Sequence, residues 1–192
     1  KEVQARIDLI EANQDEAVHG IIVQLPLETE SGEKVEGEEL QQILAKIAPE
    51  KDVDGLASDN FEPATAVAID WLLAGYNIEL TNKKIAIVGQ GLLVGKPLAK
   101  RWRNSGLNVA TFDETNAQDL DKQLANFDVI VTAVGKPGLV TGQMLKPKAV
   151  IVDAGTASEQ GKIVGDVAEE VRQTRKDIAI TPKIGGVGPL TV

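Results

Sequence analysis

The 192-residue sequence contains no cysteine and a single histidine, His19. Without cysteine there is no disulfide framework and no thiolate metal site, and one histidine excludes a histidine-rich metal site. Basic residues are also scarce, since 20 Lys and Arg stand against 29 Asp and Glu, for a formal net charge of -9. A nucleic-acid-binding surface needs a basic face, so this charge argues against nucleic acid as a partner.

Long apolar runs are absent as well. No stretch approaches the roughly 20 apolar residues that span a bilayer, and the N-terminus has no signal-peptide pattern. We therefore predict a soluble, cytoplasmic protein with no membrane partner. The sequence begins at Lys1 within a helical pattern and ends just after a glycine-rich turn, so we expect it to be part of a longer protein.

The spacing of apolar residues organises the first third of the chain. The acidic, glycine-containing residues 28–37 are typical of a solvated loop. Around this loop we predict helices over residues 1–13, 38–47 and 63–76, and one apolar strand over Gly20–Leu25 that ends at Pro26.

From residue 83 onward, short β-branched runs alternate with helical stretches, which is the pattern of a parallel sheet covered by helices. We predict strands over residues 84–88, 108–112, 129–133, 149–152 and 178–181. Helices are predicted over residues 95–105, 117–125 and 167–175, with a short turn near 141–145. The sequence therefore indicates an α/β protein whose parallel sheet follows part of a second α/β domain.

A glycine-rich loop follows the first strand of this sheet. Gly89, Gly91 and Gly95 form a G-x-G-x-x-x-G pattern that opens the next helix. Gly89 permits a tight turn, Gly91 lets a pyrophosphate approach the backbone, and Gly95 allows close helix packing. The alternative is that the loop is only a tight strand-to-helix turn.

Two acidic residues, Asp113 and Glu114, follow the next strand. A Rossmann unit places there the carboxylate that binds the ribose hydroxyls of the adenosine. Because an acid at this position repels a 2′-phosphate, we expect NAD as the cofactor rather than NADP. The alternative is that both residues only cap the following segment. Small residues at two later strand ends, Ala133–Pro137 and Asp153–Thr156, suit a nicotinamide but also occur in plain turns.

Candidate chemistry outside this loop is sparse. Asp52 and Asp54 would point the same way in an extended segment, as a ligand-binding pair, or they belong to a solvated acidic turn. Gln24 is polar within an apolar strand and needs a partner or a ligand when it is buried. The glycine-dense Gly185–Pro189 suggests backbone that passes close to another segment or to a ligand. Metal-ligand spacing is absent, so we expect no metal.

Six segments carry motifs that occur together, in this order, in one known family. They are His19–Leu27, Pro49–Gly55, Val94–Leu98, Val134–Gly138, Val164–Val167 and Gly185–Thr191. On these segments the chain resembles the bifunctional methylenetetrahydrofolate dehydrogenase/methenyltetrahydrofolate cyclohydrolase family. The resemblance implies oxidation of 5,10-methylenetetrahydrofolate to 5,10-methenyltetrahydrofolate with a nicotinamide cofactor, then hydrolysis to 10-formyltetrahydrofolate. It also implies a homodimer that binds a tetrahydrofolate derivative.

The same resemblance assigns domains and site residues. Residues 1–66, with a return over 181–192, would form part of a folate-binding catalytic domain, and residues 67–180 a dinucleotide-binding Rossmann domain. Of the two residues assigned to catalysis, Gln24 would lie near the catalytic lysine and Asp54 would hold the pterin ring. The expected folate-binding set comprises Val23, Gln24, Leu25, Asp54, Ile184, Gly185, Gly186, Val187 and Gly188. The expected cofactor-binding set comprises Gly89, Gln90, Gly91, Gly95, Asp113, Glu114 and Thr156.

Several positions depart from the family pattern. The catalytic Tyr and Lys of the family would precede Lys1, so we expect them outside this sequence. Gly89–Gly91 replaces a usual Gly-Arg-Ser and Glu114 replaces a usual Ser, and both changes remove 2′-phosphate contacts, which favours NAD. Pro63–Ala66 replaces a usual Pro-Cys-Thr-Pro, and Ile184 replaces a usual Pro.

Two other hypotheses remain open at this point. One is a non-catalytic nucleotide-binding paralogue, or a fragment that lacks the catalytic lysine. The other is a different NAD-dependent dehydrogenase on the same fold, which would make the folate-side motifs coincidental. A Tyr-x-x-x-Lys encoded upstream of Lys1 favours the folate enzyme over the non-catalytic paralogue.

Overall fold

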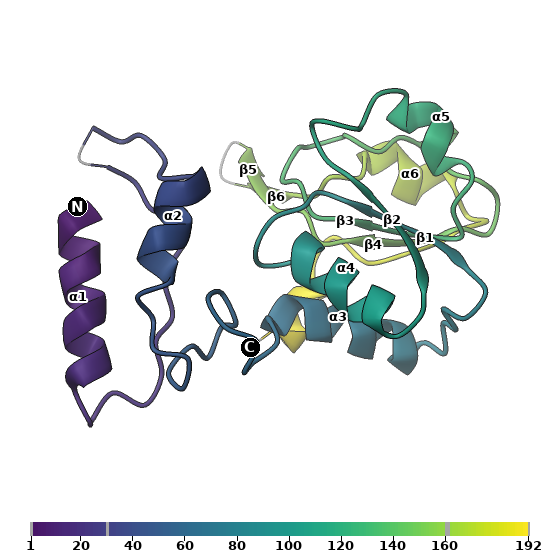
Figure 1. Cartoon of the computed structure of the whole chain (residues 1–192). Coiled ribbons are helices and arrows are strands. Elements are labelled where there is room, and N and C mark those ends of the chain that lie inside the picture. The colour runs from purple at the N-terminus through teal and green to yellow at the C-terminus, as the bar shows by residue number, and fades with distance from the viewer. Residues whose placement is uncertain (1, 30, 160–161, 192) are drawn as a thin grey trace. The chain divides into compact units, whose positions relative to one another are not determined.

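A computed structural model describes residues 2–29, 31–159 and 162–191 of the chain (Figure 1). The contacts within the chain divide it into two compact units, Lys1–Pro63 and Ala64–Val192. The division falls close to the boundary predicted at residue 66, while residues from 181 onward are grouped with the second unit. Their assignment to a catalytic domain stays a prediction. No helix in the described part of the chain is long and apolar enough to cross a membrane.

The first unit contains two helices, α1 (Glu2–Gln14) and α2 (Gly37–Leu44). Both were predicted, and α2 ends before residue 47 because a series of turns follows it. The ammonium group of Lys51 donates hydrogen bonds to the carbonyl oxygens of Ala12, Asn13 and Asp15, at 2.8 to 3.0 Å. Ala12 and Asn13 lie in the last turn of α1 and Asp15 follows it, where helix carbonyls lack partners within the helix. Lys51 therefore ties the end of α1 to the segment after α2.

The strand predicted over Gly20–Leu25 was wrong. Within the described residues of this unit, Ile21 forms an isolated parallel bridge with Asp52, and residues 22–25 have no strand structure. Ile22 is 69% exposed. A strand needs a partner along its length to satisfy its backbone groups, and apolar composition alone does not supply that partner.

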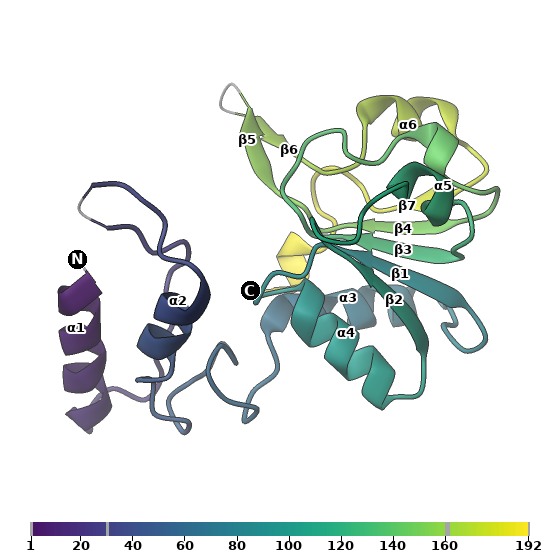
Figure 2. The same ribbon diagram turned by 45° about the horizontal axis from the view of Figure 1, so that its top comes forward.

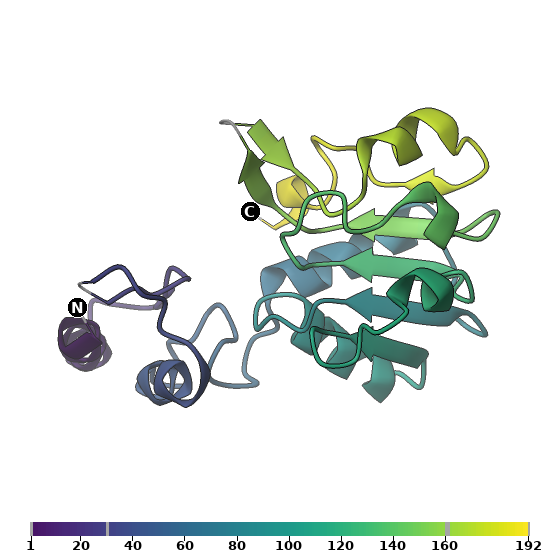
Figure 3. The same cartoon turned by 90° about the horizontal axis from the view of Figure 1, so that it is seen from above.

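The second unit is built on a five-stranded parallel sheet in the order β2-β1-β3-β4-β7 (Figure 2). Its strands are β1 (Lys84–Val88), β2 (Asn108–Phe112), β3 (Val129–Thr132), β4 (Val150–Asp153) and β7 (Ala179–Ile180). All five were predicted within one residue or so of these bounds. Because every pair is parallel, all carboxyl ends lie at one edge of the sheet (Figure 3).

Helices cover both faces of this sheet (Figures 1 and 2). On one face lie α3 (Ala64–Gly75) and α4 (Gly95–Asn104), and on the other α5 (Leu120–Leu124), α6 (Glu169–Thr174) and the 3-10 turn η1 (Gly142–Met144). Side chains of β1 alternate between the two cores. Ile85 and Ile87 pack with α3 and α4, while Ala86 and Val88 pack with α5 and α6. A strand segment buried on both faces must be apolar, as Ile85–Val88 is after the exposed Lys84.

Three short elements were not predicted. The antiparallel hairpin of β5 (Ala157–Glu159) and β6 (Lys162–Val164) projects from the carboxyl edge of the sheet (Figure 2). Neither strand is longer than three residues, so neither has a period-2 pattern long enough to detect. The 3-10 turn η2 (Gly188–Leu190) packs against α3.

Candidate functional site

The order of the strands contains one switch point. From β1 the chain moves to β2, which is the outermost strand on one side of the sheet, and then to β3 on the opposite side of β1. Gly89 follows β1 at this point and Ala133 follows β3. Open α/β sheets bind ligands in the crevice at the carboxyl ends of the strands where the order reverses. The predicted glycine loop therefore lies at the position where this fold class binds ligands.

The three glycines of this loop have different surroundings. A Cβ atom on Gly89, whose φ is +100°, would lie 2.7 Å from the carbonyl carbon of Ala133. One on Gly95 would lie 2.8 Å from the carbonyl carbon of Gly89, with the carbonyl oxygen closer still. Backbone packing thus requires glycine at both positions. Gly91 is exposed, and a Cβ there would meet nothing within 4 Å. The space in front of its backbone is open to a ligand.

The start of α4 suits an anion. Its first turn contains no acidic residue and includes Lys96 and Pro97. The N–H groups at a helix N-terminus carry partial positive charge, which favours phosphate. Gln90 is half-buried, and its side-chain amide donates a 2.9 Å hydrogen bond to the carbonyl oxygen of Gly89. The side chain of Gln90 therefore bonds to the backbone of its own loop.

Asp113 and Glu114 lie directly after β2, as predicted, but they differ in environment. The carboxylate of Asp113 accepts hydrogen bonds from the backbone N–H of Thr115, at 2.9 Å, and from its hydroxyl group. These bonds, with a smaller contribution from the charge of Lys96, hold the pKa of Asp113 below its ordinary value. Glu114 is exposed. Asp113 therefore caps the turn that follows it, and Glu114 faces solvent.

Thr156 lies just before the β5–β6 hairpin and is exposed. A Cβ on Gly135, whose φ is +77°, would lie 3.2 Å from the carbonyl oxygen of Thr156. The loop that follows β3 therefore packs on the Thr156 backbone at one end, and its first residue, Ala133, packs on Gly89 at the other. The structure brings all seven predicted cofactor residues to the carboxyl edge of the sheet, in the loops after β1, β2 and β4.

The predicted folate residues of the first unit lie in one segment and one turn. Val23 and Leu25 are half-buried and Gln24 is exposed. The side-chain amide of Gln24 donates a 3.0 Å hydrogen bond to the carbonyl oxygen of Leu25. The prediction that Gln24 is a polar group inside a strand was wrong, because this segment does not form a strand.

Asp52 and Asp54 do not act as a pair. Asp52 is fully buried, and its carboxylate accepts hydrogen bonds from the backbone N–H groups of Leu56, Ala57 and Ser58, at 2.7 to 3.1 Å. Burial alone would raise the pKa of Asp52, but the bonds from Ala57 and Ser58 outweigh it, and the pKa is lowered. Burial, and then the charge of Asp52, raise the pKa of Asp54. Asp52 shapes the turn, and Asp54 is the carboxyl group that remains for a ligand.

The remaining predicted folate residues, 184–188, lie in the second unit. Ile184 is 87% exposed, and Gly185 and Gly188 are exposed with open space where a Cβ would be. Val187 is buried in the core with α3. Its side chain anchors this loop, so a ligand would meet the glycine backbone around it.

Sequence reasoning missed a buried polar network behind the sheet edge. Asp166 is fully buried, and Arg172 pairs with the buried side chain of Asp153 at 2.8 Å. Asp166 lies in one of the motifs quoted above, between two valines and after a glycine, but no role was assigned to it. A charged residue within an apolar segment was the available signal.

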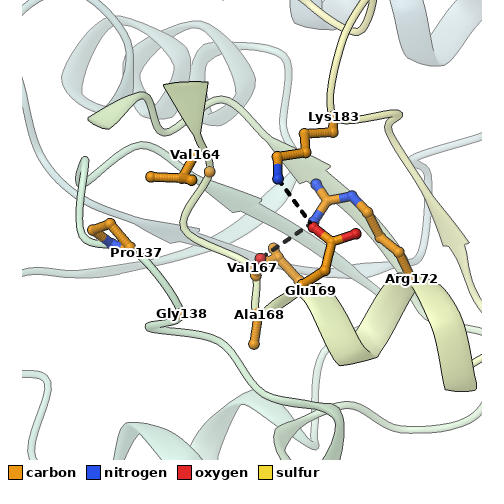
Figure 4. Close-up of a pocket in the computed structure, with 9 residues that line it drawn as sticks. Pro137, Gly138, Val164, Val167, Ala168, Glu169, Arg172 and Lys183 are labelled. Carbon is orange, nitrogen blue, oxygen red and sulfur yellow. Dashed lines mark hydrogen bonds and ion pairs between the residues drawn. The ribbon is translucent and has the colours of Figure 1, made fainter. Parts of the chain in front are cut away.

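A pocket of about 340 Å³ lies beside this network (Figure 4). It is lined by Pro137, Gly138, Val164, Gly165, Val167, Ala168, Glu169, Arg172 and Lys183. Lys183 and Glu169 pair across it at 3.2 Å. None of the predicted site residues is among these nine. In the part of the chain that the structure describes, the pocket included, no cluster of three or more His, Asp or Glu side chains is arranged to hold a metal ion.

Comparison with known proteins places this geometry in context. Residues 63–192 match the NAD(P)-binding domain of tetrahydrofolate dehydrogenase/cyclohydrolase. The bifunctional protein FolD of Macrococcus caseolyticus is 42% identical in an alignment 191 positions long, which covers 94% of this chain and 64% of that protein. FolD of Aquifex aeolicus is 39% identical and covers 96% of this chain, again with 64% of its own length matched. The chain thus spans just under two thirds of these curated relatives.

Solved structures give the same result. The Trypanosoma brucei N5,N10-methylenetetrahydrofolate dehydrogenase-cyclohydrolase, complexed with NADP cofactor and inhibitor, matches with a TM-score of 0.84 and 32% identity. The match covers 100% of this chain and 68% of the Trypanosoma brucei chain. The FolD enzyme of Campylobacter jejuni matches with a TM-score of 0.82 and 32% identity, and the match covers 100% of this chain and 69% of the Campylobacter jejuni chain.

Proposed function

Since the chain belongs to the tetrahydrofolate dehydrogenase/cyclohydrolase family, we propose that it oxidises 5,10-methylenetetrahydrofolate to 5,10-methenyltetrahydrofolate with a nicotinamide cofactor, as part of a longer protein. Hydrolysis of the product to 10-formyltetrahydrofolate completes the proposed reaction. The observation that carries this proposal is the glycine loop at the switch point. Gly89 and Gly95 are needed for packing, whereas the open space at Gly91 suits a pyrophosphate.

In the proposed mechanism, residues at the carboxyl edge of the sheet would hold the dinucleotide. Gly91 and the start of α4 would hold its pyrophosphate, and Gly135 and Thr156 would lie on the nicotinamide side. The bound cofactor would supply a hydride acceptor for the folate, so the chain would need no nucleophile of its own. The chain contributes alignment of the two reactants and the electrostatics of the site.

The folate side of the proposal is argued for each unit separately. In the first unit, Asp54 would hold the pterin ring, and its raised pKa makes its carboxyl group easier to protonate, which suits hydrogen bonding in either direction with a heterocycle. Gln24 would act as a polar partner beside the catalytic lysine of the family. In the second unit, the exposed backbone of 184–188 would supply folate contacts.

We further propose that the cofactor is NAD. Glu114 is exposed beside the ionised Asp113, so two negative charges would face the 2′-phosphate of NADP. Coulomb repulsion between these carboxylates and the phosphate would disfavour NADP, to an extent that solvent and salt reduce. Lys96 acts in the opposite direction, since its charge reaches Asp113, but one cation does not offset two acids.

The test is calorimetric titration of NAD and NADP into the wild-type chain and a Glu114→Ser variant. We expect NAD to bind the wild type more tightly, and the variant to gain about tenfold in NADP affinity, equivalent to about 1.4 kcal/mol. Asp121→Ser, on the exposed side of α5, changes the net charge equally and serves as the control. If neither cofactor binds the wild-type chain, the proposed function is overturned.

The family activity has its own test. Oxidation of 5,10-methylenetetrahydrofolate, followed by absorbance of the reduced nicotinamide, is measured for the longer protein and its Asp54→Asn variant. We expect the variant to lose most of kcat/KM for the folate while its affinity for NAD is unchanged. Cofactor binding without folate oxidation by the longer protein would instead support the non-catalytic paralogue.

We also propose that the protein forms a homodimer. The β5–β6 hairpin projects from the sheet (Figure 3) and carries Ile163, which is 67% exposed. Burying such a side chain against a second copy would stabilise the association by about 1.5 to 3 kcal/mol. Sedimentation of the wild type and an Ile163→Asp variant tests this. A wild-type chain that sediments as a monomer at micromolar concentration would overturn it.

A further inference from the structure

Asp166 is the buried acid of the network behind the sheet edge. It lies in the segment between β6 and α6 and is 0% exposed. Its carboxylate oxygens accept hydrogen bonds from the backbone N–H groups of Val134, at 2.8 Å, and Lys136, at 2.7 Å. One side chain therefore binds two N–H groups of the loop after β3, one on either side of Gly135.

This loop has two contacts that matter for the switch point. Its first residue, Ala133, packs against Gly89, and Gly135 packs against the backbone of Thr156. Gly135 and its neighbours are exposed, and Gly135 has a φ of +77°. Holding an exposed loop in one conformation costs conformational entropy, and the hydrogen bonds to Asp166 add to these packing contacts in offsetting that cost. The Asp166 carboxylate supplies the buried anchor.

The surrounding chain makes room for that carboxylate. A Cβ on Gly155, two residues after the end of β4, would overlap the carboxylate of Asp166 itself. A Cβ on Gly165 would in the same way overlap the carboxylate of Asp153. The backbone N–H of Asp166 donates a 2.9 Å bond to Asp153, whose other carboxylate oxygen pairs with Arg172. Asp166 is thus held at both its backbone and its side chain, so its position is set independently of any ligand.

We propose that Asp166 is a positioning residue for the cofactor, because its carboxylate fixes the loop Val134–Lys136 between Gly89 and Thr156. It touches neither the dinucleotide nor the folate. It acts by binding the backbone N–H groups of Val134 and Lys136, which keeps the outer side of the loop in one conformation where the nicotinamide would lie. This inference rests on the proposed function, and it adds to that function a residue outside the ligand-contacting set.

The obvious variant is Asp166→Asn, which keeps the side-chain volume and one acceptor oxygen but turns an N–H donor toward the loop. A donor facing a buried backbone N–H leaves both without a partner. The second variant is Gly155→Ala, which leaves Asp166 and the net charge intact and displaces the carboxylate with a methyl group. Leu124→Ala serves as the control, because Leu124 is fully buried on α5 and its apolar side chain can neither donate nor accept a hydrogen bond in this loop.

Two measurements are made on each protein, at a temperature where thermal unfolding shows it to be folded. Calorimetry gives the Kd for NAD, and amide hydrogen exchange followed by NMR gives the protection of the Val134 and Lys136 N–H groups. We expect Asp166→Asn and Gly155→Ala to weaken NAD binding at least tenfold and to lose protection at both amides. Leu124→Ala should lower the melting temperature by as much or more, and change the Kd less than twofold.

The outcomes separate the two proposals. If the wild-type chain binds neither NAD nor NADP, the proposed function is overturned. If the wild type binds NAD and Asp166→Asn binds it equally well, only the role of Asp166 is overturned. If Leu124→Ala weakens NAD binding as much as Asp166→Asn does, Asp166 has a general structural role and the positioning proposal is overturned. If Asp166→Asn does not fold, Gly155→Ala decides between these outcomes.

Discussion

The glycine loop provides a sharp test, because its glycines differ in what the structure requires of them. Replacing Gly91 by alanine adds a methyl group that meets no atom within 4 Å, at a position whose φ is not in the left-handed region. Replacing Gly95 adds one 2.8 Å from the carbonyl carbon of Gly89 and closer to its oxygen. The methyl group of Gly91→Ala would therefore lie in open space, whereas that of Gly95→Ala would overlap the backbone carbonyl of Gly89.

Opposite effects on stability follow. For Gly95→Ala, ordinary contact begins at 3.4 Å, so the loop or α4 must shift, and overpacking of this kind costs about 1 to 3 kcal/mol. For Gly91→Ala, the free energy of unfolding should stay equal or rise by up to about 1 kcal/mol, because alanine restricts the unfolded chain. The affinity for NAD should nevertheless fall at least tenfold in Gly91→Ala, about 1.4 kcal/mol, since the methyl group lies where the pyrophosphate approaches.

Urea unfolding and calorimetric titration of NAD measure these two quantities on the same three proteins. A Gly91→Ala chain that is stable and binds NAD as tightly as the wild type would refute the assignment of Gly91 to the pyrophosphate. A Gly91→Ala chain as unstable as Gly95→Ala would refute the structural argument itself, because the space in front of Gly91 would then not be open.

Other predictions concern the frame around the site. Asp52→Asn should cost about 1 to 3 kcal/mol in urea unfolding, because one backbone N–H of its turn loses its acceptor. Because the pKa of Asp52 is lowered, the stability that its ionised carboxylate adds to the fold should be present above pH 3.8 and lost as the pH falls further. Acid unfolding followed by amide exchange in this turn can detect that loss. Trp102→Phe should cost about 1 to 3 kcal/mol by the same assay, since the buried indole N–H donates to Asp70. A hydrogen bond from Arg175 lowers the pKa of Asp177 to about 2, so NMR titration of this carboxyl should show a midpoint near 2, and the pair should stop stabilising the fold as the pH falls from 3.8 through 2.

Much of the second unit was predictable from sequence because its signals are local. The strands β1 and β2 were predicted at their observed bounds. Residues Ile85–Val88 of β1 are apolar because both faces of this strand are covered, whereas β2 is only partly buried but contains the β-branched and aromatic residues that favour strands. The β5–β6 hairpin was missed because three residues carry no detectable period. In the first unit, Gly20–Leu25 had the composition of a strand but forms a single bridge at Ile21. Whether an apolar run becomes a strand depends on a partner that the run does not encode.

The candidate site divides in the same way. Sequence located the loops at Gly89–Gly95 and after β2, because their residue types follow directly from the conformations and charges that a dinucleotide needs. It also missed Asp166, whose importance arises from contacts 30 and 32 residues away in the chain.

By itself, the sequence determined the alternation of strands and helices, and with it a parallel sheet with its glycine loop at the carboxyl edge. These features depend on neighbours along the chain, whose spacing a sequence states directly. Only the tertiary structure decided that Gly89 and Gly95 serve packing while Gly91 faces open space, that Asp52 is bound by its own turn, and that Asp166 anchors the loop after β3. Each of these depends on which backbone groups meet after folding, and contacts between distant segments follow from the packing of the whole unit.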